Sequence, residues 1–127
     1  MKIILINNSS VPLYEQIKES IKENILKDKI KSGEKLPSVR NLSKELGVSI
    51  LTVKKAYDEL ESEGFIESRQ GLGTFVAEED PNLRREEKQK ILEENLSKAI
   101  EISKEIKLSK ETFLELFEYL YGGEENG

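Results

Sequence analysis

The sequence predicts a mainly α-helical protein with one small β-hairpin, on three observations. Apolar residues recur at intervals of three and four along most of the 127-residue chain, which is the pattern of amphipathic helices. Proline, serine and glycine stand where these stretches begin and end. Two short β-prone runs flank a glycine-bearing loop near the middle of the chain. We therefore expect three helices, a hairpin and two further helices, arranged as one small domain with a helical appendage.

The composition excludes several kinds of chemistry. The chain has no cysteine and no histidine, so disulfides, thiolate catalysis and the commonest general base and metal ligand are all absent. An enzyme would need carboxylates or lysine in a pocket, but the Asp and Glu residues are spread over helix faces. We expect no enzyme activity, no cofactor and no metal. No apolar run approaches the ~20 residues of a membrane span, so we expect a cytoplasmic protein without a membrane partner.

The net charge of −5 is unevenly distributed along the chain. Residues 1–76 contain 12 Lys and Arg against 11 Asp and Glu, a net charge of +1, whereas residues 77–127 contain 8 against 14, a net charge of −6. The first part can therefore present a basic face to a nucleic acid although the whole chain is acidic.

An N-terminal arm, residues 1–10, contains a short β-prone run at 2–6 that we expect to form a strand. Pro12 then occupies the first position of a helix that extends to about Lys29, because a missing N–H costs nothing there. The expected buried face of this helix comprises Leu13, Ile17, Ile21, Ile25 and Leu26. We interpret the charged residues of the other face as solvated, namely Glu15, Lys18, Glu19, Lys22 and Glu23.

Two short helices follow, joined by a tight turn. Ser38 is the expected N-cap of the helix Val39–Leu46, and Gly47 can adopt the left-handed conformation that ends it. Ser49 can then cap the next helix, which closes at Gly64. Its expected buried face is Val53, Ala56, Tyr57 and Leu60. Helices joined in this way form a helix-turn-helix.

The exposed start of the second of these helices combines hydroxyl groups, apolar tips and cations. Such side chains suit base edges, thymine methyl groups and phosphates in a DNA major groove. An ordinary solvated first turn is the alternative reading of the helix taken alone. The residues concerned are Ser49, Ile50, Leu51, Thr52, Lys54 and Lys55.

The β-prone runs 65–69 and 74–76 surround the loop 70–73 and predict a hairpin, which directly after a recognition helix is the wing of a winged helix. Arg69 and Gln70 lie at its edge, where arginine suits a narrow minor groove. Gly71 and Gly73 allow close approach of the backbone. They are no nucleotide-binding fingerprint, because the third glycine and the following helix are missing.

The C-terminal part predicts a charge-rich helix from Asn82 to about Lys107 and a second helix, capped by Ser109, from Lys110 to Tyr121. The apolar residues of the first of these helices form a narrow seam, and those of the second form a broad patch. Both surfaces need to be covered, either by the other helix or by a second chain. We expect dimerisation through this region, 79–121, followed by a flexible tail, 122–127. The predicted dimerisation residues are Leu92, Leu96, Ala99, Ile106, Phe113, Leu116, Phe117 and Leu120.

Residues 11–78 resemble the DNA-binding domain of GntR-family transcriptional regulators. Four motifs carry the resemblance: Pro-x-Tyr-x-Gln-Ile from Pro12, Gly-x-Lys-Leu-Pro-Ser-x-Arg from Gly33, Thr-Val-x-Lys-Ala-Tyr from Thr52, and Gly-x-Gly-Thr-Phe-Val from Gly71. The short helical C-terminal part is similar to that of the YtrA subfamily. The resemblance implies a homodimer that binds a palindromic operator in double-stranded DNA and acts as a repressor.

The resemblance also implies which residues face DNA. The distribution of charge further predicts that lysines contact the phosphates. The sequence departs from the family pattern at Ile50, Leu51 and Leu72, which affects the bases read and weakens the charge of the wing. A winged helix that binds proteins rather than specific DNA remains the alternative, and a small-molecule effector remains open. The predicted DNA-binding residues are Lys35, Ser38, Arg40, Lys44, Ser49, Ile50, Leu51, Thr52, Lys54, Lys55, Arg69, Gln70, Gly71, Leu72 and Gly73.

Overall fold

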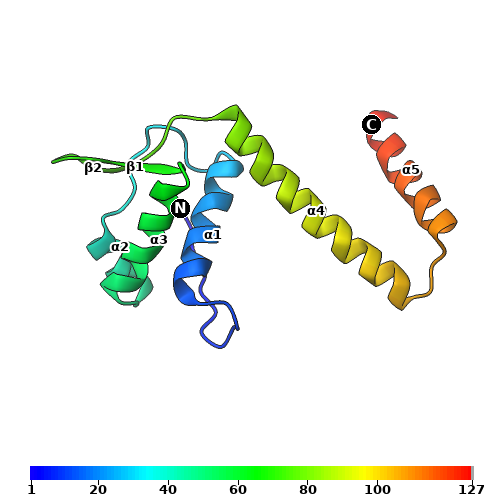
Figure 1. Ribbon diagram of the computed structural model, residues 1–127, viewed down its shortest axis with the longest axis horizontal. Coiled ribbons are helices and arrows are strands. Elements are labelled where there is room, and N and C mark those ends of the chain that lie inside the picture. Colours follow the sequence, from blue (N-terminus) through cyan, green and yellow to red (C-terminus); the bar gives the residue numbers. More distant parts are fainter. Residues whose placement is uncertain (127) are drawn as a thin grey trace. The chain divides into compact units, whose positions relative to one another are not determined.

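The computed structural model describes residues 1–126, and the side chains of residues 1–122 (Figure 1). The chain divides into two compact units, Met1–Arg84 and the residues from Arg85 onward. No helix among the described residues is long and apolar enough to cross a membrane. The elements in order are α1 (Leu13–Leu26), α2 (Val39–Leu46), α3 (Ile50–Ser62), β1 (Ile66–Arg69), β2 (Gly73–Val76), α4 (Pro81–Glu105) and α5 (Lys110–Asn126).

The first unit has a single hydrophobic core in which α1, α2 and the two strands surround α3. The predicted buried face of α3 is confirmed, since all of its members are at most 5% exposed. The Tyr57 hydroxyl on this face donates a hydrogen bond of 2.7 Å to the carbonyl of Pro37 and so fixes the chain as it enters α2. The core residues are Ile17, Ile21, Ile30, Leu36, Leu42, Val53, Ala56, Tyr57, Leu60, Phe65, Ile66 and Val76.

The turn between α2 and α3 is fixed by local hydrogen bonds, as the sequence predicts. The Ser38 hydroxyl accepts from the backbone N–H of Asn41 at 3.0 Å. Gly47 ends α2 with a positive φ of 68°, and the Ser49 hydroxyl then accepts from the N–H of Thr52 at 3.1 Å. These caps satisfy backbone groups that a helix end leaves unpaired, so the angle between the two helices is set by the turn itself.

The hairpin pairs β1 and β2 in antiparallel register, with Ile66 opposite Val76 and Arg69 opposite Gly73. The segment before α2 extends this small sheet, because Lys35 forms a bridge with Phe75. The backbone N–H of Leu36 donates to the carbonyl of Thr74 at 2.8 Å. The predicted wing is therefore present and is braced by the segment that leads into α2.

The N-terminal arm differs from the prediction. Residues 2–6 form no strand and do not pair with the hairpin. Ile3 and Leu5 instead pack, partly buried, against the core of the first unit. Pro12 is the N-cap of α1 rather than its first helical residue. The helix also ends at Leu26 rather than near Lys29, because Asp28 turns the chain with a positive φ of 56°.

The charged face of α1 is not simply solvated, contrary to the prediction. Lys22 is only 6% exposed, and its Nζ lies 2.8 Å from a carboxylate oxygen of Glu63 at the end of α3. The Nζ of Lys18 lies 3.0 Å from Glu59 and also forms an ion pair with Glu63. Helical spacing identified the exposed side of an isolated helix, but α3 covers part of that side with its own carboxylates.

This ion-pair cluster shifts the pKa values of Lys18 and Glu63. Burial by itself lowers the pKa of Lys18, but hydrogen bonds to Glu63 and Glu59 outweigh burial and raise it. Burial likewise raises the pKa of Glu63, and hydrogen bonds from Lys18 and Lys22 outweigh it and lower that pKa. Lys18 and Glu63 therefore stay charged in the fold at neutral pH.

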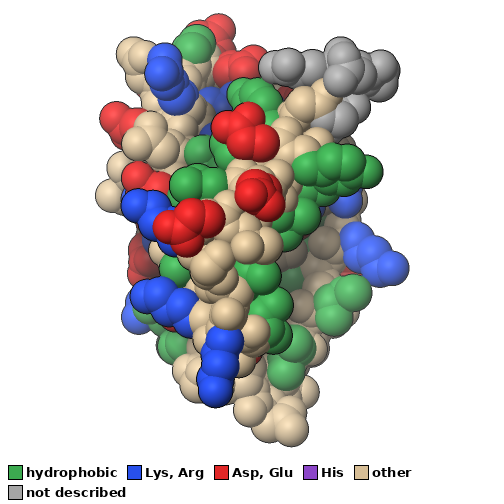
Figure 2. Space-filling model, turned by 90° about the vertical axis from the view of Figure 1, so that its right-hand side faces the viewer, with side chains coloured by type: hydrophobic (Ala, Val, Ile, Leu, Met, Phe, Trp, Pro, Cys, Tyr) green, Lys and Arg blue, Asp and Glu red, His purple; other side chains and the backbone are tan. Residues whose placement is uncertain are grey.

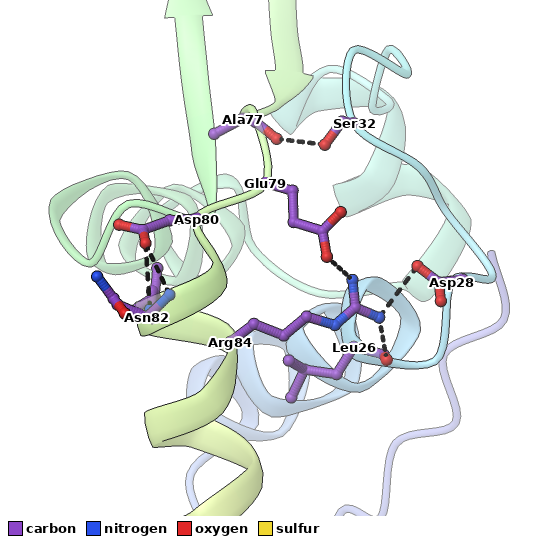
Figure 3. A network of polar contacts seen from close by, with 9 residues as sticks. Leu26, Asp28, Ser32, Ala77, Glu79, Asp80, Asn82 and Arg84 are labelled. Carbon is purple, nitrogen blue, oxygen red and sulfur yellow. Dashed lines mark hydrogen bonds and ion pairs between the residues drawn. The ribbon is translucent and has the colours of Figure 1, made fainter.

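The first turn of α4 belongs to the first unit and is held there by Arg84 (Figure 3). Its guanidinium donates to the carbonyl of Leu26 at 2.6 Å, and lies 3.0 Å from the carboxylate of Asp28 and 2.7 Å from that of Glu79. These contacts join the end of α1 to the linker before α4. The first unit consequently ends at residue 84, beyond the boundary at residue 78 that the sequence predicts.

The second unit contains the rest of α4 and α5. Ser109 caps α5 as predicted, with its hydroxyl accepting from the N–H of Thr112 at 3.1 Å. The predicted end at Tyr121 is wrong, since α5 continues to Asn126. Glycines at 122 and 123 lower helix propensity by about 1 kcal/mol each but keep their backbone N–H donors. Gly127, the last residue of the predicted tail, lies outside the described residues.

Apolar side chains of both helices in the second unit are exposed, and Figure 2 shows hydrophobic side chains beside acidic ones on one face of the molecule. Leu96 and Phe117 are each about half exposed. Ala99 and Phe113 are half-buried. The exposed large apolar residues are Ile91, Leu92, Leu96, Ile100, Ile102, Ile106, Leu114, Leu116, Phe117, Tyr119, Leu120 and Tyr121.

We predict that Glu63→Gln lowers the free energy of unfolding by about 1–2 kcal/mol at pH 7, because two cations lose their charged acceptor. The pKa of Glu63 lies below its ordinary value of 4.5, so this stabilisation is complete above pH 4.5 and disappears as the pH falls through the lower pKa of the folded state. Urea denaturation of wild type and variant across this range measures it.

The control is Glu23→Gln, which removes an exposed ion pair with Lys27 four residues along α1. We expect it to change stability by less than about 0.5 kcal/mol. A Glu63 variant no less stable than this control would contradict the role assigned to the cluster.

Candidate nucleic-acid interface

The front end of α3 presents apolar and hydroxyl side chains on the surface of the first unit. Leu51 is 76% exposed and Ile50 is 46% exposed, although both are large apolar residues. The hydroxyls of Ser49 and Thr52 lie 2.8 Å apart, so they support the cap as well as facing solvent. The front of α3 is therefore held in helical form by its cap and exposes its side chains to a partner.

Both lysines of this helix already have partners within the chain. The Nζ of Lys54 lies 2.8 Å from the carboxylate of Asp58, and both side chains are more than half exposed. Such an exposed pair is weak and can be exchanged for a phosphate. The Nζ of Lys55 lies 3.9 Å from the centre of the Tyr14 ring, so α1 orients this cation. Sequence reasoning missed Tyr14, although the motif that begins at Pro12 contains it.

The short helix α2 adds exposed polar and cationic groups next to the turn. Arg40 lies in its first turn and Lys44 near its end, and both are exposed. Ser38 is also exposed, with its hydroxyl engaged in the cap. The structure thus presents the predicted residues of α2 on the surface of the same unit as the front of α3.

The tip of the wing is apolar and its arginine is partly neutralised. Leu72 is 62% exposed between Gly71 and Gly73. Arg69 donates to a carboxylate oxygen of Glu67 at 2.7 Å, and its guanidinium lies 4.3 Å from the centre of the Phe75 ring. The sequence correctly indicated that Arg69 lies at the edge of the loop. It did not indicate these contacts, which depend on how strand side chains lie across the sheet.

Lys35 lies against the wing. A Cβ built on Gly73, whose φ is +120°, would stand only 2.8 Å from the Cε of Lys35. Lys35 therefore brings a cation to the base of the wing, where the tip carries leucine. The sequence singled out Lys35 as a phosphate contact, and only the bridge to Phe75 reveals that it belongs to the wing.

Comparisons with known proteins agree with this geometry. Residues 13–76 match the family described as "Bacterial regulatory proteins, gntR family". The chain is 45% identical over 92 residues to the HTH-type transcriptional repressor YtrA of Bacillus subtilis (strain 168), which covers 72% of this chain and 71% of that protein.

Two solved structures extend the comparison. The structure of YtrA from Sulfolobus acidocaldarius, a GntR-family transcription factor, is 38% identical with a TM-score of 0.59, covering 75% of this chain and 97% of that one. The DNA-binding domain of AraR, solved in complex with operator ORX1, is 38% identical with a TM-score of 0.54, covering 61% and 96%. The winged-helix fold and the regulator class predicted from the sequence are confirmed.

We predict that Gly73→Ala lowers the free energy of unfolding by about 1–3 kcal/mol, because alanine is strained at a φ of +120°, whereas the end of the Lys35 side chain can move away from the added Cβ. Gly71→Ala is the matched control: its φ is +75° and no atom lies within 4 Å of the added Cβ, so about 1 kcal/mol is expected. Urea denaturation compares the two variants. A loss at Gly73 no greater than the loss at Gly71 would contradict the strain assigned to the φ of Gly73.

Proposed function

This chain belongs to the GntR family of bacterial regulatory proteins, and we propose that it represses transcription as a homodimer bound to a palindromic operator. The observation that carries the proposal is the front of α3, where the capped helix exposes Ile50 and Leu51 beside hydroxyl and cationic groups. An isolated soluble domain gains nothing from exposing two large apolar side chains there, whereas thymine methyl groups can cover them.

In this proposal the front of α3 enters the major groove. Ser49 and Thr52 hold the helix N-terminus, whose backbone dipole favours the negative potential of DNA. Ile50 and Leu51 meet thymine methyl groups. Lys54 exchanges its weak pair with Asp58 for a phosphate, since a phosphate of the duplex offers a stronger field than one exposed carboxylate.

The other contacts surround this helix. Arg40 reads a base or binds a phosphate from the start of α2, and Lys44 and Lys55 contact the backbone. The wing enters the minor groove with Gly71 and Gly73 close to the sugar edges. Leu72 at the tip carries no charge, so the positive charge of the wing comes from Lys35 and from Arg69, which is partly neutralised by Glu67. We therefore expect the wing to fix the position of the domain on DNA more than to increase its electrostatic attraction to DNA.

The second unit supports dimerisation. Apolar residues on both of its helices are exposed, and side chains such as Leu92, at 64%, and Ile106, at 68%, exceed what one chain covers. Two copies that share these faces would carry two winged helices related by a twofold axis. Half-sites about one helical turn, ~34 Å, apart would then fit both recognition helices. Occupancy of such a site over a promoter blocks transcription.

We predict that Arg40→Ala and Lys54→Ala each weaken binding to the DNA upstream of the protein's own gene by about 1–3 kcal/mol, if these residues read bases. Fluorescence anisotropy at several salt concentrations measures the affinity, with a scrambled duplex as the control. Equal and weak binding of the wild type to both duplexes would favour a protein-binding role. Unchanged affinity in both variants would eliminate the proposed docking of α2 and α3.

We predict that Phe117→Asp converts the protein to monomers and weakens operator binding by at least tenfold, because a charge at the centre of an apolar interface loses its water. Sedimentation equilibrium gives the oligomeric state. Glu118→Asp, beside it on α5, changes no charge and is the control. A variant that remains dimeric would move the interface away from α5.

A further inference from the structure

The motif that begins at Pro12 contains a glutamine that DNA docking does not use. The side-chain amide of Gln16 bonds both ends of the loop that precedes α1. Its Oε1 accepts from the backbone N–H of Ile6 at 2.8 Å, and its Nε2 donates to the carbonyls of Ile6 at 3.0 Å and Val11 at 2.8 Å. One side chain thus closes the loop formed by residues 7–10.

Further contacts fix the loop from both sides. The backbone N–H of Val11 donates to the hydroxyl of Ser9 at 3.1 Å, and the N–H of Ser9 donates to the carbonyl of Ile6 at 3.4 Å. Before the loop, Ile3 and Leu5 anchor the arm on the core of the first unit. The loop is therefore a built feature of the domain, although the residues of the loop itself are exposed.

The loop lies beside the front of α3. Asn7 and Leu5 line a surface hollow together with Gly47, Ser49 and Thr52 of the helix-turn-helix. In Figure 1 the dark blue loop lies at the same end of the first unit as the turn between α2 and α3. A duplex that receives the front of α3 in its major groove therefore brings the adjacent backbone toward this loop.

The chemistry of the loop suits phosphate oxygens. Residues 7–10 are two asparagines and two serines, whose amide and hydroxyl groups are donors of the kind that contact DNA phosphates. No Asp or Glu precedes Glu15 in the sequence, so no carboxylate of the arm repels a phosphate there. The loop itself thus offers neutral donors, and the nearest carboxylate on the hollow that it lines with α3 is that of Glu45, which belongs to α2.

We propose that the loop of residues 7–10 is an additional contact of this protein with the DNA phosphate backbone, flanking the half-site, and that Gln16 is its positioning residue. The proposal rests on the proposed function, in which the front of α3 enters the major groove. Neutral donors displace no counterions and read no bases. The loop therefore adds affinity equally on any duplex and leaves the salt dependence of binding unchanged.

The test replaces the two amides together, Asn7→Ala with Asn8→Ala. This leaves the hydrogen bonds of the Gln16 side chain in place, because their partners are backbone atoms of Ile6 and Val11. Anisotropy titrations use a duplex from the DNA upstream of the gene and a scrambled duplex, each at several salt concentrations. We expect affinity to fall about three- to tenfold on both duplexes, with the slope of log Kd against log salt unchanged. Gln89→Ala, an exposed amide on α4, is the control and should bind as the wild type does.

A second measurement locates the contact on the DNA. Methylphosphonate replacement of single phosphates removes their charge. At the phosphates that flank the half-site, this replacement should weaken binding of the wild type but leave binding of the double variant unchanged. Gln16→Ala should reproduce the loss of the double variant, with thermal denaturation used to establish that the domain remains folded.

The outcomes separate this inference from the proposed function. Unchanged affinity of the double variant, or a loss confined to the upstream duplex, would overturn the phosphate contact. If Lys44→Ala still lowered both the affinity and the slope of log Kd against log salt in that case, the proposed function would stand without the loop contact. If Lys44→Ala, Arg40→Ala and the loop variant all left binding unchanged, both the loop contact and the proposed docking of the domain on DNA would be contradicted.

Discussion

The contact between α1 and α3 is the constraint on which the first unit depends. Apolar packing holds the middle of α3, and the ion pairs of Lys18 and Lys22 with Glu59 and Glu63 hold its C-terminal end. The front half of α3 is held by the buried side chains of Val53 and Ala56 and by the Ser49 cap, so its outer face can expose Ile50 and Leu51 to a partner.

Features determined by neighbouring residues could be predicted from the sequence. The bounds of α2, the caps at Ser38 and Ser49 and the buried face of α3 follow from local hydrogen bonding and helical spacing, and all are confirmed. Features that depend on distant partners could not. The carboxylates that cover Lys22 come from another helix, and the arm before α1 packs on the core instead of forming a strand. Within the site, exposure was predictable, but the packing of the Arg69 guanidinium on the Phe75 ring of the other strand was not.

Internal ion pairs explain how a chain with a net charge of −5 can present a surface suited to DNA. In the first unit, carboxylates at the back of α3 are occupied by Lys18 and Lys22, so they are neutralised away from the front. The carboxylate of Glu61 accepts from the N–H and hydroxyl of Ser68. Near the turn, α2 exposes two cations, Arg40 and Lys44, against one carboxylate, that of Glu45.

The ion pairs between α1 and the end of α3 also determine how this protein responds to pH. The pKa of Lys18 is raised and that of Glu63 is lowered, so both ionisations are moved away from neutrality, and the chain has no imidazole that titrates between them. The ion pair between Lys18 and Glu63, which joins α1 to the end of α3, therefore persists when the pH changes around neutrality.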